Sequence, residues 1–135
     1  MSANQTPHAI FVYGTLKRGQ CRERAWPRRP LGVESAWTLG RLYDLGPYPA
    51  LIEGTDRVLG EVWRFAPEDM RESLRVLDGI EGFRDQSDDL YRREVVECTT
   101  ESGIVVRAYT YCYARPLPAG ARLVTANASG FLVWS

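Results

Sequence analysis

This sequence is best understood from one short stretch, Phe11-Val12-Tyr13-Gly14-Thr15-Leu16-Lys17-Arg18-Gly19. Residues 9–12 are apolar, and most are β-branched or aromatic, which is typical of a buried strand. Gly14 then ends the strand, because glycine adopts backbone angles closed to other residues and lets a ligand approach the main chain. The N–H groups that follow need partners. Two interpretations stay open: a tight turn with Tyr13 in the core, or a loop that binds a carboxylate or an oxyanion.

The composition limits the kind of protein that this chain can be. With 135 residues, 44% of them hydrophobic, we expect one domain over residues 1–135, with residues 1–7 loosely ordered. The 17 basic and 17 acidic residues balance, whereas nucleic acids and membrane surfaces attract an excess of basic charge. We therefore expect neither a nucleic acid nor a membrane as a partner.

The cysteines and the absence of long apolar runs indicate a cytoplasmic protein. Cys21, Cys98 and Cys112 are odd in number and lack the spacing of a metal site, so we interpret them as reduced thiols. The N-terminus is short and polar, unlike a signal peptide. No apolar run approaches the roughly 18 residues needed to cross a bilayer.

Apolar periodicity predicts many short strands and one helix. The helix starts at Pro67, where two acidic residues follow, and carries one apolar stripe to about Asp78, stopping at Gly79. The strands are expected at 9–12, 33–45 with Gly40 as a candidate bulge, 50–52, 58–65, 91–98 and 104–113, with turns at 54–56 and 101–103. These elements predict an α+β fold in which a small closed sheet carries a helix.

Two segments leave alternatives open. Tyr109, Tyr111 and Tyr113 share one face of their strand, which is either core with hydroxyls aimed at a pocket or a half-exposed surface. The tail from Ala121 to Ser135 is mostly apolar and is expected to pack back on the sheet, although its end, residues 131–134, could also be a contact surface.

The usual catalytic motifs are missing, which leaves carboxylate chemistry. His8 is the single histidine, and the glycines near Gly14 fit neither a phosphate loop nor a dinucleotide fingerprint. Glu81 stands out, because it lies among Ile80, Gly82 and Phe83 after the predicted helix. Apolar surroundings raise a carboxyl pKa, so Glu81 could exchange protons near neutral pH. The alternative is a glutamate that points to solvent.

Several blocks of the sequence together resemble γ-glutamylcyclotransferase-like (AIG2-like) proteins. The blocks are, in order, Phe11 to Gln20, Gly40 to Leu51, Gly60 to Trp63, Leu77 to Gly82 and Tyr91 to Val95. The resemblance implies a small mixed β-barrel with helices packed outside. It also implies an enzyme without a cofactor that releases 5-oxoproline from a γ-glutamyl compound, as the substrate's own α-amine attacks its γ-carbonyl.

The resemblance also implies roles for individual residues. Glu81 would be the general acid and base, and the loop Tyr13-Gly14-Thr15-Leu16 would offer main-chain N–H groups to the glutamyl part of the substrate. Tyr91 would form a wall of the pocket. The sequence names neither the leaving group nor the oligomeric state.

One departure from the family motivates an alternative function. Many members end near Ser-Gly-Asp-Trp, whereas here Ser129-Gly130 is followed by Phe131-Leu132-Val133-Trp134. If this change alters the back of the pocket, the chain could be a non-catalytic member of the same fold that binds a small ligand.

Overall fold

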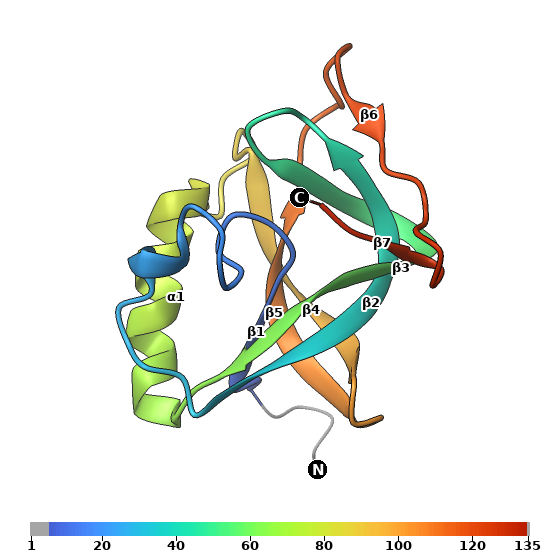
Figure 1. Cartoon of the computed structure of the whole chain (residues 1–135). Helices are drawn as coiled ribbons and strands as arrows, with labels where there is room; N and C mark the ends of the chain where they lie inside the picture. The colour runs from blue at the N-terminus through green and yellow to red at the C-terminus, as the bar shows by residue number, and fades with distance from the viewer. Residues whose placement is uncertain (1–5, 135) are drawn as a thin grey trace.

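The computed structural model of this chain describes residues 6–134 (Figure 1). Of the N-terminal segment that we expect to be loosely ordered, residues 1–5 lie outside the described residues. Thr6 and Pro7 have no regular secondary structure, and the first strand begins at Ala9.

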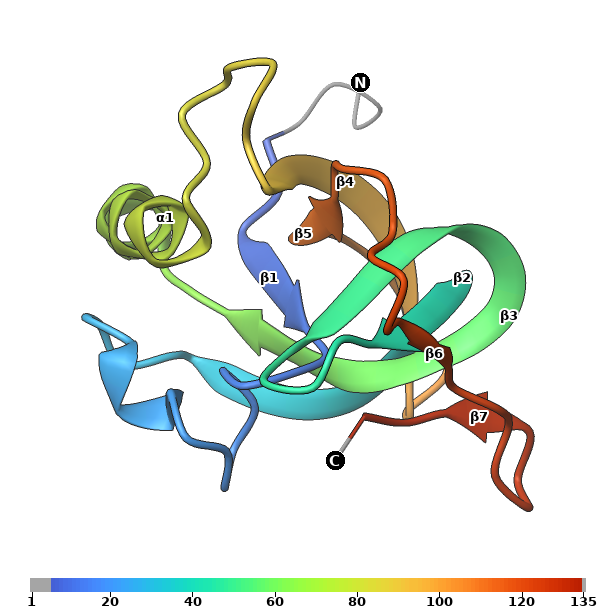
Figure 2. The same cartoon turned by 90° about the horizontal axis from the view of Figure 1, so that it is seen from above.

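The strands close into a barrel. They are β1 (Ala9–Val12), β2 (Gly32–Asp44), β3 (Pro49–Arg64), β4 (Tyr91–Thr100), β5 (Val105–Tyr113), β6 (Arg122–Leu123) and β7 (Phe131–Leu132). Their order is β6-β2-β4-β5-β1-β3-β7, and an additional pairing of β2 with β3 closes the ring (Figure 1 and Figure 2). Because β1 is parallel to β5 and antiparallel to β3, the sheet is mixed. The expected α+β fold with a small mixed β-barrel is confirmed.

Helix α1 (Pro67–Glu81) packs outside this barrel and is longer than the sequence predicts (Figure 1). The expectation that it stops at Gly79 is wrong: the helix continues to Glu81 and ends at Gly82, whose φ of 70° is left-handed. The N–H of Phe83 donates to the carbonyl of Asp78 and closes this end. Glu81 is therefore the last residue of a rigid helix rather than part of a loop.

The family resemblance implies several helices outside the barrel, but the described chain has one α-helix and a short 3-10 helix, Glu23–Ala25. The 3-10 helix forms a single turn shortly before Pro27. None of the described helices is both long and apolar enough to cross a membrane.

Strand β3 differs from its prediction. We expect two strands separated by a turn at Gly54-Thr55-Asp56, but β3 is continuous from Pro49 to Arg64. The register with β2 shifts between Gly40 and Arg41: Gly40 pairs with Asp56 and Arg41 with Ile52, so the unpaired residues, 53–55, lie on β3 and not at the predicted bulge residue Gly40. A Cβ on Gly54 would lie 2.8 Å from the carbonyl carbon of Gly40. This glycine therefore permits a close approach of two strands instead of a turn.

Strand β1 is buried on both faces, as its apolar sequence predicts. Phe11 belongs to the cluster that fills the barrel, whereas Ile10 and Val12 belong to the cluster between barrel and helix. The strand alternates between two cores because successive side chains point to opposite faces. Its end consequently lies where barrel and helix meet.

The tail packs back on the barrel, as expected. β6 pairs with β2, and β7 pairs with β3 in parallel. Leu132 and Trp134 are buried in the cluster that fills the barrel, so these two side chains are core rather than contact surface. On β5, Tyr111 is buried, and Tyr109 and Tyr113 pack against the cluster on the helix side.

Candidate active site

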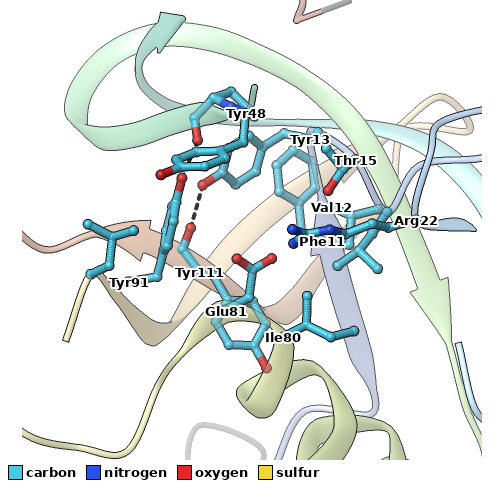
Figure 3. A pocket seen from close by; sticks show the side chains of 14 residues that line it. Phe11, Val12, Tyr13, Thr15, Arg22, Tyr48, Ile80, Glu81, Tyr91 and Tyr111 are labelled. Carbon is cyan, nitrogen blue, oxygen red and sulfur yellow. Dashed lines mark hydrogen bonds between the residues drawn. The ribbon is translucent and has the colours of Figure 1, made fainter. Parts of the chain in front are cut away.

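A cavity of about 110 Å³ lies between the end of β1, the C-terminal end of α1 and the start of β4 (Figure 3). All the site residues that we expect from the sequence line it: Tyr13, Gly14, Thr15, Leu16, Glu81 and Tyr91. The fold thus brings the loop after β1 and the end of α1, which are distant in sequence, to one cavity.

Glu81 is the titratable carboxyl group of this cavity. Its side chain points toward the centre, with Tyr91 on one side and Arg22 on the other (Figure 3). Burial raises the pKa of Glu81 to about 7, and the nearby Arg22 guanidinium opposes this rise. Both protonation states are therefore populated at neutral pH, as a group that accepts and returns a proton requires.

The loop after β1 offers main-chain donors beside this carboxyl group. Two carbonyls of this loop already accept backbone hydrogen bonds: Gly14 O accepts from Lys17 N, and Thr15 O accepts from Arg22 N. Within residues 6–134, no acceptor faces the N–H groups of Gly14, Thr15 or Leu16 at hydrogen-bond distance. These N–H groups can therefore bind a ligand oxygen.

Gly14 is needed for close packing at this place. A Cβ on Gly14 would lie 2.7 Å from Cγ of Pro49 and 2.8 Å from its Cδ. The carbonyl of Pro49 in turn accepts a hydrogen bond of 2.6 Å from the hydroxyl of Tyr91. Any larger residue at position 14 would push apart two walls of the cavity.

Tyr13 and Tyr91 form walls of the cavity and do not act as acids or bases there. The hydroxyl of Tyr13 donates to the carbonyl of Tyr111, and that of Tyr91 donates to Pro49. Burial raises the pKa of Tyr13 and of Tyr91 well above the usual value, so both phenols stay neutral. Tyr91 also packs edge-on against Tyr48 and Tyr113. Of these three side chains, Glu81 is the one that can exchange a proton near neutral pH.

Asp78 fixes the end of α1 against the barrel. Its Oδ1 accepts a hydrogen bond of 2.6 Å from the hydroxyl of Tyr111 on β5, and its Oδ2 lies 2.6 Å from Nη1 of Arg93 on β4. Asp78 precedes Glu81 by three residues, so both lie on the helix face toward the barrel. These contacts determine where Glu81 points.

Sequence reasoning missed several residues that line the cavity, among them Arg22, Tyr48, Pro49 and Tyr111. Tyr111 belongs to the tyrosine face, but its hydroxyl binds Asp78 instead of pointing to a ligand. Arg22 is one of several arginines in the connection 20–32, and no local pattern separates it from its neighbours. The distinguishing contact is between Arg22 N and Thr15 O, which exists only in the folded chain.

The unusual tail lies behind the loop instead of lining the cavity. The Lys17 ammonium donates to the carbonyl of Trp134 at 3.0 Å, and Trp134 Nε1 donates to Asp44 Oδ1 at 3.2 Å. Trp134 is thus a support for the loop, and the altered residues 131–134 are not in contact with the space that a ligand would fill.

The described part of the chain contains no cluster of metal ligands, and two of its three thiols are difficult to ionise. Between residues 6 and 134, no three His, Cys, Asp or Glu side chains gather as metal ligands. The three cysteines are free, and burial raises the pKa of Cys98 and of Cys112 to about 12. Neither of these two thiols forms a nucleophilic thiolate near neutral pH.

The chain belongs to the family described as "Gamma-glutamyl cyclotransferase, AIG2-like", whose model matches residues 10–129. The match includes the loop after β1, Glu81 and Tyr91. It confirms the resemblance that the sequence blocks indicate.

Relatives and solved structures agree with this assignment. A Vibrio cholerae protein named "Putative gamma-glutamylcyclotransferase" is 35% identical over 91 residues, 67% of this chain and 72% of that protein. The "Gamma-L-glutamyl-butirosin B gamma-glutamyl cyclotransferase" of Niallia circulans is 32% identical over 108 residues, 78% of this chain and 67% of that protein. The crystal structure of an AIG2-like protein from Mus musculus is 28% identical, with a TM-score of 0.65 over 84% of this chain and 82% of that one.

Proposed function

We propose that this protein is a γ-glutamyl cyclotransferase that converts a γ-glutamyl amide into 5-oxoproline and a free amine. The family and the named relatives support this activity in general. The observation that supports the proposal is the shared cavity: a carboxyl group with a pKa of about 7 lines the same cavity as N–H groups that have no acceptor within residues 6–134.

In the proposed reaction, the substrate supplies its own nucleophile. Glu81 takes a proton from the α-ammonium group, and the freed nitrogen attacks the γ-carbonyl carbon, forming the new C–N bond of the ring. Glu81 returns this proton to the leaving nitrogen and then takes the second proton from the ring nitrogen, and the bond from the carbon to the leaving nitrogen breaks. The second proton passes to the released amine, which leaves as an ammonium ion and regenerates the ionised Glu81. Atoms balance without water, metal or cofactor.

The remaining residues hold the substrate in place. The N–H groups of Gly14, Thr15 and Leu16 bind oxygen atoms of the glutamyl part, while Tyr13 and Tyr91 bound its space. When the amine and the carbonyl of one molecule are held together, the activation free energy of their reaction falls by several kcal/mol, and by roughly 7–11 kcal/mol in the best cases. A serine or cysteine nucleophile is therefore unnecessary.

The identity of the product tests this proposal. Incubating the protein with γ-glutamyl-alanine should release 5-oxoproline and alanine in equal amounts, with no free glutamate, as measured by mass spectrometry. The N-acetyl derivative of the same substrate should give no product, because its α-nitrogen cannot attack. Glutamate as the product would indicate hydrolysis, and binding of γ-glutamyl substrates without any product would indicate the non-catalytic alternative.

The pH dependence gives a second expected result. Because Glu81 must be ionised to accept the proton and its pKa is about 7, kcat/KM should rise about tenfold per pH unit below pH 7 and level off above it. The measurement is kcat/KM between pH 5 and 8. A kcat/KM that is constant from pH 5 to 8, as expected for a glutamate with the ordinary pKa of 4.5, would contradict the role of the buried carboxyl group.

A further inference from the structure

Arg22 brings a positive charge to the open side of the cavity. It is an exposed residue, yet it lines the cavity, and its guanidinium points toward the space above Glu81 (Figure 3). Across residues 6–134, the guanidinium makes neither a hydrogen bond nor an ion pair within 4.0 Å. Its donors are therefore available to a ligand.

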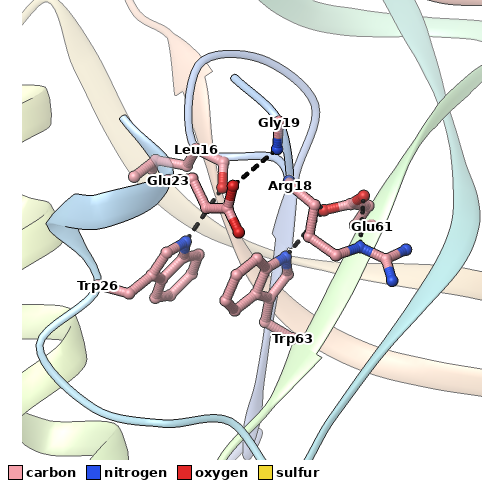
Figure 4. Close-up of polar contacts among 7 residues, drawn as sticks. All are labelled: Leu16, Arg18, Gly19, Glu23, Trp26, Glu61 and Trp63. Carbon is pink, nitrogen blue, oxygen red and sulfur yellow. Dashed lines mark hydrogen bonds and ion pairs between the residues drawn. The ribbon is translucent and has the colours of Figure 1, made fainter. Parts of the chain in front are cut away.

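The main chain of Arg22 is fixed to the loop that lines the cavity. Arg22 N donates to Thr15 O at 2.8 Å. On the same connection, Glu23 Oε1 accepts from Gly19 N at 2.8 Å, and Trp26 Nε1 donates to Leu16 O at 3.0 Å (Figure 4). The guanidinium consequently extends from a backbone position that is held relative to the cavity rather than from a free loop.

A stacked pair of indole rings holds the middle of the connection 20–32 against the barrel. The rings of Trp26 and Trp63 lie 4.3 Å apart with an interplanar angle of 9°, and Trp26 also stacks on Phe65 at 5.3 Å. Because Trp63 is part of β3, residues 22–26 follow the barrel as one unit. Such preorganisation lowers the entropy cost of binding.

The position of Arg22 determines which part of a substrate it can reach. The inner walls are the buried residues Tyr13, Pro49 and Tyr91, so the ring must close there, beside Glu81. The exposed residues of the lining are Arg22 and Leu90, so the substituent on the leaving nitrogen extends toward them, and Arg22 is the charged one of the two. A guanidinium binds a carboxylate through two parallel hydrogen bonds, which an alkyl or an ammonium group cannot accept.

We propose that Arg22 binds a carboxylate on the leaving group, so that the preferred substrates are γ-glutamyl amino acids rather than γ-glutamyl derivatives of simple amines. This inference rests on the proposed function and deepens it. The glutamyl part binds to the loop N–H groups, and Arg22 selects what is attached to it. A cationic leaving group is repelled at the same position.

A matched series of substrates tests the role of Arg22. γ-Glutamyl-alanine and γ-glutamyl-ethylamide differ only in the leaving-group carboxylate, and γ-glutamyl-aminoethylamide carries a cation there. For the unaltered protein, kcat/KM should be highest for the first and lowest for the last, with the first exceeding the second about tenfold, or about 1.4 kcal/mol. In Arg22→Gln, this ratio should fall to about one.

Controls separate recognition from other effects of the charge. Arg22 also lowers the pKa of Glu81, so each variant is measured on the plateau of its own pH profile. Arg24→Gln removes a neighbouring arginine that does not line the cavity, and its substrate ratio should equal that of the unaltered protein. If Arg22→Gln slows all three substrates equally, Arg22 contacts the glutamyl part, and the inference is overturned.

A binding measurement keeps this test independent of turnover. In Glu81→Gln, γ-glutamyl-alanine should bind about tenfold tighter than γ-glutamyl-ethylamide by calorimetry, and the added Arg22→Gln change should abolish the difference. Equal affinities would overturn the inference even for an active enzyme. A tenfold difference in a protein that releases no product would support it and contradict the proposed function instead.

Discussion

Glu81→Gln is expected to release 5-oxoproline from γ-glutamyl-alanine roughly 10³-fold more slowly than the unaltered protein, within the range for loss of a general base. The amide cannot accept the proton of the α-ammonium group, and the phenols of Tyr13 and Tyr91, whose pKa values burial raises, cannot replace Glu81 as the base. The measurement is kcat at pH 8.

The variant should lose activity without losing stability. Burial raises the pKa of Glu81 from its ordinary 4.5 to about 7, so ionisation favours the unfolded state as pH rises from about 4.5 to 7, and this cost persists above pH 7. Removing the charge should leave the free energy of unfolding at pH 8 equal or higher.

Glu68→Gln, an exposed change on the same helix, should keep full activity. Near-normal turnover by Glu81→Gln would contradict the proposed base.

Gly60→Ala is expected to lower the free energy of unfolding by about 3 kcal/mol and the melting temperature by roughly 10 °C. A Cβ at this position would lie 2.3 Å from the carbonyl oxygen of Val12 and 2.7 Å from Cζ of Phe11. The first contact is with backbone, so β1 and β3 would have to move apart. Thermal unfolding followed by circular dichroism measures the effect.

Gly79→Ala is the matched control. It makes the same chemical change at a glycine inside α1 where the added Cβ meets no atom within 4 Å. Alanine should raise the free energy of unfolding by about 0.5–1 kcal/mol, because glycine is the weaker helix former. Equal melting temperatures for Gly60→Ala and the unaltered protein would show that β1 and β3 can separate without cost.

Local sequence patterns predict most of the helices and strands but not all of their boundaries. The helix start at Pro67 follows from backbone constraints that act within a few residues. Local patterns also predict a turn at Gly54 and a helix end at Gly79, but β3 continues through Gly54 and α1 continues to Glu81. A glycine that permits a close strand approach, or one that is tolerated inside a helix, has the same local sequence as a breaker.

The sequence by itself determined the family, the loop at residues 13–16 and the candidate carboxyl group Glu81, because each depends on residue types in a fixed order. Only the tertiary structure decided that these residues line one cavity, that Asp78 orients the end of the helix and that Arg22 faces the same space. Barrel closure and burial create these relations between residues distant in sequence, and the raised pKa of Glu81 exists only once the folded chain removes water from around it.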